Sequence, residues 1–237
     1  MSKIPIHLGN RLRLCASFVK PGAHLCDVGT DHAYLPIWLA SQHLVSSTVA
    51  CDVREGPLAI AKTNIQNCGL QNQISIRLSD GLAAVKSKEA ETIVVAGMGG
   101  DLIARIILET RWLYDSKKQI IVQPMTKPSH LRKAMAEGGF ALLKECAVFD
   151  EKRVYSVMEY QYCPEKAFSA NNICIYTGKL TGKSAAEQEY LRRQYYYLRQ
   201  CLSGKLHSGQ SAETELLQKA VDFIQQLLNL SVQEVSQ

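Results

Sequence analysis

Cysteine pairs at metal-binding spacing are missing from this sequence of 237 residues. Its eight cysteines are scattered, and no two of them form a C-x-x-C motif. Structural zinc sites are built on such pairs, so we expect no metal site. The sequence also lacks a recognisable signal peptide and any apolar run long enough to span a membrane. Both absences favour a cytoplasmic protein with reduced thiols and no membrane partner.

Internal repeats and low-complexity tracts are absent too, which excludes solenoid and disordered classes. The 46% hydrophobic and 21% charged composition is typical of a soluble globular protein. The net charge of +5 is small but unevenly distributed. Residues 1–26 carry four Lys or Arg and no acid, and 179–207 carry six against two Glu. These basic zones fit either a polyanionic partner or a solvated surface.

Short apolar runs alternate with helix-length amphipathic segments up to residue 162. Strands are predicted at 23–28, 47–52, 73–79, 91–97, 118–123, 140–149 and 153–162. Helices are predicted near 33–43, 56–68, 81–88, 100–112 and 127–138. This alternation indicates a doubly wound, Rossmann-like α/β sheet of parallel strands. The last two runs are joined by three residues only, so they form a hairpin that places one antiparallel strand in the sheet.

The pattern changes after Pro164. Two helices with apolar seams at spacings of four, three and four residues follow, separated by a turn-like segment at 204–211. The seam residues are Leu191, Tyr195, Leu198 and Leu202, then Leu217, Val221, Ile224 and Leu228. Such seams predict an antiparallel helical hairpin, or coiled coil. We therefore expect an α/β domain over 1–164 and a helical domain over 165–237.

The most informative run is LCDVGTDHAY at 25–34, a buried strand that ends in an acid and leads through a glycine turn into a helix. Ligands of doubly wound sheets bind at the carboxyl ends of the strands. The dinucleotide fingerprint is broken here, because Asp31 stands at the second glycine position. Asp27 and Asp31 would repel a pyrophosphate, whereas they suit a ligand with an ammonium and a sulfonium group. This sign argument favours S-adenosylmethionine.

Two further acids follow the next two strands. Asp52 ends the second strand about 20 residues past the first glycine, where a carboxylate binds ribose hydroxyls. Asp80 follows the third strand and could meet the adenine amino group, while Gly81 turns the chain. Each Asp alone could be a helix N-cap. Three acids after three successive strands favour cofactor binding.

The fourth and fifth strands end in AGMGGD (96–101) and QPM (123–125). Glycines allow the backbone to approach a ligand closely, so the reacting group is expected beside this turn. Asp101 fits a helix N-cap equally well. Gln123 could read a base edge or be structural.

These motifs together resemble those of the TrmK family, bacterial tRNA (adenine-N1)-methyltransferases that act on adenosine 22. The matching segments are DVGTDHAYLP (27–36), Asp52, SDGL (79–82), AGMGG (96–100) and QPM (123–125). Small departures are Thr30, Asp52 and Met125, where serine, glutamate and asparagine are common. The resemblance implies a class I methyltransferase sheet, S-adenosylmethionine as cofactor, tRNA as partner and a C-terminal coiled coil.

It also implies roles for individual residues. Expected at the cofactor are Asp27, Gly29, Thr30, Asp31, His32, Asp52, Val53, Asp80, Gly81, Leu82, Gly97 and Met98. Asp31 is the catalytic candidate, unless it holds the cofactor's ammonium group. Expected at the target base are Tyr34, Gly99 and Gln123, with His32 as a second stacking candidate. Expected at the phosphates of the tRNA body are Arg11, Arg13, Arg192, Arg193 and Arg199.

Three other functions fit the same residues less well. One is a methyltransferase for another RNA, a protein or a small molecule, with the hairpin as an oligomerisation element. The others are a Rossmann-type oxidoreductase and a nucleotide-binding module without activity. For the tRNA enzyme, we expect a monomer or a weak dimer.

Overall fold

The computed structural model describes residues 6–169, 171–206 and 212–229. A seven-stranded sheet of strand order β3-β2-β1-β4-β5-β7-β6 forms its centre, and only β7 runs antiparallel to its neighbours. This confirms the predicted α/β, Rossmann-like class of fold. The strands are β1 (Ala23–Val28), β2 (Val45–Asp52), β3 (Ile74–Leu78), β4 (Thr92–Gly99), β5 (Gln119–Thr126), β6 (Phe140–Asp150) and β7 (Arg153–Tyr162).

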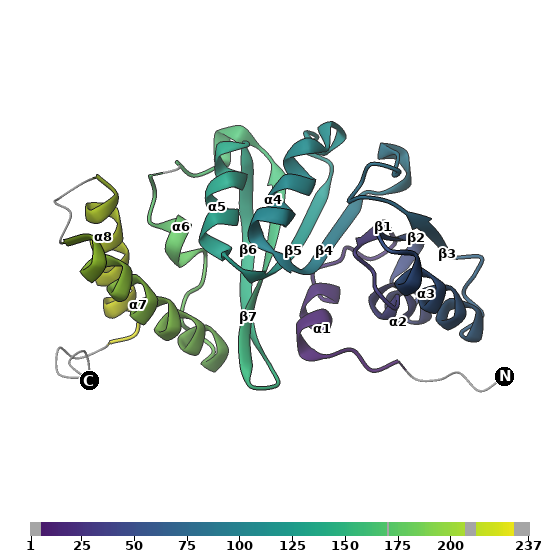
Figure 1. The fold of residues 1–237 in the computed structure, drawn as a ribbon, viewed down its shortest axis with the longest axis horizontal. Coiled ribbons are helices and arrows are strands. Elements are labelled where there is room, and N and C mark those ends of the chain that lie inside the picture. The colour runs from purple at the N-terminus through teal and green to yellow at the C-terminus, as the bar shows by residue number, and fades with distance from the viewer. Residues whose placement is uncertain (1–5, 170, 207–211, 230–237) are drawn as a thin grey trace.

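Helices cover both faces of this sheet (Figure 1). They are α1 (Asn10–Ala16), α2 (Tyr34–Ser41), α3 (Glu55–Asn67), α4 (Gly100–Glu109), α5 (Pro128–Glu137), α6 (Cys174–Thr177), α7 (Ala185–Leu206) and α8 (Ala212–Leu227). In β4, Ile93 and Val95 pack into the core under α4 and α5, whereas Val94 packs into the core under α1, α2 and α3. Burial on both sides explains why the strands read as continuous apolar runs.

The helix predicted at 81–88 is wrong. The segment after β3 forms tight turns and then a short 3-10 helix at Ser87–Glu89. Ser79 Oγ accepts a hydrogen bond from Ala84 N (3.0 Å) and donates one to Gly81 O (2.9 Å), and Gly81 has a positive φ of 55°. These local bonds compete with the helical ladder. The turns keep Asp80 beside the end of β3.

Helices α7 and α8 pack against each other beside the sheet edge formed by β6 (Figure 1). Their contact is a separate apolar cluster that contains seven of the eight predicted seam residues, and Leu228 packs against it from the side. Residues 207–211 of the predicted turn lie outside the described residues, and α7 continues through 204–206. The domain boundary at residue 164 stays a prediction.

A buried ion pair attaches this C-terminal region to the sheet. Arg132 Nη2 of α5 donates to Glu145 Oε1 of β6 at 2.5 Å, and both side chains are fully buried. Arg132 Nη1 also donates to Ile175 O (3.2 Å), and Lys179 N donates to Glu145 Oε2 (2.9 Å). Gly178 has a positive φ, and a Cβ there would overlap the Glu145 carboxylate. Glycine at position 178 therefore allows the backbone of residues 175–179 to pass close to the ion pair and to hydrogen-bond with both of its side chains.

Candidate active site

The turn after β1 folds back across the end of β2. Gly29 N and Thr30 N both donate to Cys51 O, at 2.8 and 2.9 Å. Gly29, Asp31 and Ala33 all have positive φ, so helix α2 begins only at Tyr34. This path brings Asp31 N to Asp52 Oδ2 at 3.2 Å. The first two acidic loops are thus joined by a hydrogen bond.

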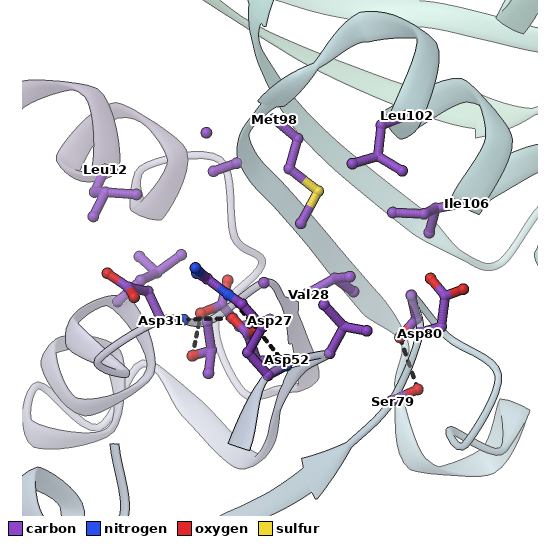
Figure 2. Close-up of a pocket in the computed structure, with 18 of the residues that line it drawn as sticks. Leu12, Asp27, Val28, Asp31, Asp52, Ser79, Asp80, Met98, Leu102 and Ile106 are labelled. Atoms are coloured by element: carbon purple, nitrogen blue, oxygen red, sulfur yellow. Dashed lines mark hydrogen bonds and ion pairs between the residues drawn. The ribbon is translucent and has the colours of Figure 1, made fainter. Parts of the chain in front are cut away.

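Asp27 and Asp52 lie buried at the floor of the crevice that results, while the side chains of Asp31 and Asp80 are exposed (Figure 2). Burial raises the pKa of Asp27 to about 6; the hydrogen bond from Thr30 Oγ1 (2.7 Å) lowers it, and the charge of Asp52 raises it further. A buried carboxylate next to a second one is stabilised by a cation. The floor therefore favours a positively charged ligand.

Asp52 and Asp80 keep acceptor capacity toward the crevice. Asp52 Oδ1 accepts a hydrogen bond from Arg54 N at 3.0 Å, and Oδ2 accepts one from Asp31 N. A carboxylate offers about four acceptor positions, so two hydroxyl groups can still bind. Asp80 is paired with Arg105 at 3.2 Å, on the exposed side of the turn after β3.

The crevice is a cavity of about 440 Å³, within the range of small-molecule sites. Met98, Leu102 and Ile106 form its apolar side, opposite Asp27, Asp31 and Asp52 (Figure 2). Gly29 has a φ of 70°, and a Cβ there would overlap the Met98 methyl group. The positive φ and this close approach both favour glycine at this position of the turn after β1. The cavity joins an acidic floor to an apolar wall, which suits a cationic nucleoside.

Comparisons with known proteins agree with this geometry. Residues 8–158 match the model of a methyltransferase domain. A tRNA (adenine(22)-N(1))-methyltransferase of Bacillus subtilis is 30% identical over 213 residues, which is 89% of each chain. The chain belongs to the TrmK family.

Solved structures of similar chains extend this result. The crystal structure of the B. subtilis m1A22 tRNA methyltransferase TrmK has a TM-score of 0.74 and 25% identity, with 94% of this chain and all of that chain covered. A Streptococcus pneumoniae protein solved in complex with S-adenosyl-L-methionine has a TM-score of 0.77 and 32% identity, with the same coverage. The similarity thus includes the C-terminal helices as well as the sheet.

In this TrmK family member, most of the predicted cofactor residues line one crevice. They are Asp27, Gly29, Thr30, Asp31, Asp52, Val53, Asp80, Gly81, Gly97 and Met98. Tyr34, predicted at the target base, lines it too and is 43% exposed. Leu82 does not: it is buried in the core under α4 and α5. His32 lies beside the crevice, where its ring meets Tyr34 edge-on.

Gln123 is placed differently from its expected contact with the base. Its side chain is fully buried and does not line the crevice. Oε1 accepts from Arg11 Nη1 (2.7 Å) and Gly97 N (3.1 Å), while Nε2 donates to Pro124 O (2.8 Å). Because both the oxygen and the nitrogen of its amide are hydrogen-bonded within the protein, Gln123 holds neighbouring groups in place and does not contact a base. Gly99 is the last residue of β4, lies beside Thr126, and does not line the crevice.

The predicted phosphate-binding arginines separate into two groups. Arg11 lies inside the crevice, whereas Arg13 is exposed on the same short helix. Arg192 and Arg193 are exposed on α7 and paired with Glu189, and Arg199 lies over the Tyr195 ring. The structure does not bring the arginines of α7 to the crevice.

Of the apolar wall of the crevice, sequence reasoning identified Met98 but missed Leu102 and Ile106. Leu102 and Ile106 lie one turn apart on α4, directly after the AGMGG motif, and this spacing was a usable signal. Leu12 and Arg54 also line the crevice, and no local pattern marks them. Among the described residues, no cluster of three or more His, Cys, Asp or Glu could hold a metal ion. Nor does any helix in the described part of the chain have the length and apolarity to cross a membrane.

Proposed function

We propose that this protein transfers a methyl group from S-adenosylmethionine to N1 of adenosine 22 in tRNA. The observation that carries the proposal is the crevice at the carboxyl ends of β1, β2 and β3, where carboxylates from three strands face an apolar wall. Membership of the TrmK family supports the reaction and the substrate, because the B. subtilis relative is named for them. Diphosphate cofactors fit poorly, because the same carboxylates would repel them.

The crevice residues fit S-adenosylmethionine group by group. Asp52 has free acceptor positions for the two ribose hydroxyls. Asp80 lies across from Ile106, so the wall suits the flat face of adenine and Asp80 suits its amino group (Figure 2). Asp27 and Asp31 supply negative charge for the ammonium group. When bound, S-adenosylmethionine supplies an electrophilic methyl group on a positively charged sulfur.

On the acceptor side, the protein's main task is alignment. N1 of adenine has an available lone pair, so no proton has to leave before it attacks. Holding reacting groups in line contributes a large part of many rate enhancements. The product base carries a positive charge, and the exposed Asp31 carboxylate can stabilise it or accept a proton from the exocyclic amine. Asp31 can alternatively hold the ammonium group of the cofactor.

The target base has to leave its stack to reach the crevice. Tyr34 is the stacking candidate, because it is an exposed aromatic on the crevice wall. For the tRNA body, we assign phosphate contacts to Arg13 and to the α7 arginines at 192, 193 and 199. We assign the enzyme to the cytoplasm, as a monomer or weak dimer, with a helical domain from residue 165.

The test is methylation of an unmodified tRNA transcript with labelled S-adenosylmethionine, followed by nuclease digestion and mass spectrometry. We expect 1-methyladenosine at position 22. A transcript with guanosine at position 22 is the matched control and should stay unlabelled. A different product nucleoside, or labelling of the control at another position, contradicts the proposal. Asp31→Ala tests its role separately: loss of turnover with unchanged cofactor affinity supports catalysis, and parallel loss of affinity supports ammonium binding.

A further inference from the structure

Contacts with three distant parts of the chain fix the position of Arg11 in the crevice. Its Nη1 donates to Gln123 Oε1 of β5 at 2.7 Å. Its Nε lies 3.9 Å from Asp150 Oδ2 at the end of β6. Its guanidinium also lies against Gly97, with Nη1 3.5 Å from where a Cβ would be. The side chain is only 21% exposed, so the guanidinium is held at the crevice wall.

Each of these partners is itself fixed. Gln123 is fully buried, and the bond from Gly97 N sets its Oε1 toward Arg11. Asp150 accepts from Asn10 N at 2.9 Å, and Asn10 Nδ2 donates to Phe149 O at 3.0 Å. The first turn of α1 is therefore docked onto the tip of the β6–β7 hairpin. This docking places Arg11 against Gly97, near the end of β4, where the acceptor is expected.

The charge of Arg11 is unusual at this place. Among the described residues that line the crevice, four are aspartates and two are arginines, Arg11 and Arg54. Arg54 lies beside Asp52, at the expected ribose site. Arg11 lies on the other side, next to the backbone at Gly97. S-adenosylmethionine carries one carboxylate besides its two positive groups, so the anionic group that Arg11 binds is either this carboxylate or a phosphate of the second substrate.

An extruded nucleotide brings such a group with it. Base flipping rotates the nucleotide about its backbone, so its flanking phosphates approach the pocket mouth. A guanidinium is suited to phosphate because it is planar and always charged. With Nη1 committed to Gln123, Nη2 is the edge that can donate to a phosphate oxygen.

We propose that Arg11 binds a phosphate flanking the target adenosine, and that Gln123 and Asp150 are positioning residues that hold Arg11 for this contact. The proposal rests on the proposed function. It differs from a contact with the tRNA body, because Arg11 would act on the one nucleotide that enters the crevice. Substrate binding and turnover, but not cofactor binding, then depend on Arg11.

The test compares Arg11→Ala and Arg11→Lys with wild type in methylation of a tRNA transcript. The charge-matched control is Lys117→Ala, an exposed residue before β5 at the opposite edge of the sheet. Hydrogen bonds to charged groups contribute about 1.5–3 kcal/mol, so kcat/KM for tRNA should fall about 10- to 100-fold in Arg11→Ala. Arg11→Lys should lie between, and Lys117→Ala should stay within about twofold. The dissociation constant for S-adenosylmethionine, measured by calorimetry, should change by less than about twofold throughout.

Neutralising single phosphates of the tRNA shows which phosphate Arg11 contacts. Transcripts carrying a neutral methylphosphonate on the 5′ or the 3′ side of adenosine 22 remove one charge each. One of them should lower wild-type kcat/KM about as much as Arg11→Ala does, and should cause no further loss in that variant. Additive losses at both positions overturn the proposal. So does an Arg11→Ala enzyme that matches Lys117→Ala, or one that loses S-adenosylmethionine binding in parallel. Failure of the wild type to form 1-methyladenosine would refute the proposed function instead.

Discussion

We expect cofactor binding to depend on pH through Asp27, and the burial of this residue gives the sign and the approximate size of the effect. Its carboxyl group is buried next to Asp52, and burial raises its pKa from 3.8 to about 6. The rise corresponds to about 3 kcal/mol in favour of the neutral form. A bound cation reverses this preference, because it stabilises the ionised form. Binding should therefore be accompanied by proton release below about pH 6.

The stability of the free protein should change in the opposite direction to cofactor affinity. Between pH 3.8 and about 6, the folded chain holds more protons on Asp27 than the unfolded chain does. The free energy of unfolding therefore falls as pH rises through this window, by up to about 3 kcal/mol from this group. Affinity for S-adenosylmethionine should instead fall as pH drops below 6, by up to about tenfold per pH unit.

Calorimetric titration with S-adenosylmethionine at pH 7.5, 6 and 5 tests the predicted change in affinity. Repeating each titration in two buffers with different ionisation heats measures the protons released on binding. Asp27→Asn should bind the cofactor more weakly at pH 7.5, without proton release, and the free variant should be more stable than wild type by up to about 3 kcal/mol. Thr30 can still donate to the Asn oxygen, which preserves the local structure. The control is Asp80→Asn, an exposed acid of the same crevice, which should not stabilise the free protein. Constant affinity from pH 7.5 to 5 without proton release would refute the reasoning.

Three further predictions concern the rest of the molecule. Asp52→Asn should weaken S-adenosylmethionine binding by about 10- to 100-fold, since it removes the ionised acceptor for ribose hydroxyls, and unchanged calorimetric affinity would contradict that role. Glu145→Gln leaves the Arg132 charge buried without its partner, so the free energy of unfolding measured in urea should drop by about 3–5 kcal/mol. The double variant Arg132→Met/Glu145→Leu, which removes both charges, should recover most of this loss of stability. If tRNA phosphates bind Arg192 and Arg193, replacing both by Gln should make the slope of log affinity against log salt concentration less steep by about 1.5–2. An unchanged slope would show that these two arginines do not contact the tRNA.

The clustering of the cofactor acids could be predicted from the sequence, because it follows from local order. Apolar runs that alternate with helices form a parallel sheet, and the carboxyl ends of parallel strands meet at one edge. An acid at the carboxyl end of a strand must therefore lie at that edge, as Asp27 and Asp52 do. The seam spacing predicted the apolar contact between α7 and α8 in the same way. In each case a regular repeat, of parallel strands or of helical turns, places these residues side by side.

The sequence-based predictions were wrong where a hydrogen bond to the backbone, or a contact with a distant segment, outweighs the local pattern of polar and apolar residues. The segment 81–88 has a helical composition, but Ser79 captures the amide of Ala84 and the chain turns instead. Gln123 lies in the carboxyl-terminal half of a strand, yet its amide oxygen accepts hydrogen bonds from Arg11 and Gly97 and so does not face the crevice. Neither outcome is visible in a pattern of polar and apolar residues.

By itself, the sequence determined the class of sheet, the acidic edge and the charge of the ligand, because periodicity and strand order act over short distances along the chain. The tertiary structure alone decided that Arg11 meets Gln123 and Asp150, which are 112 and about 140 residues away. It also decided that Arg132 and Glu145 meet in the core. Such pairs form only when packing has removed water and brought unrelated segments together, so no local rule specifies them.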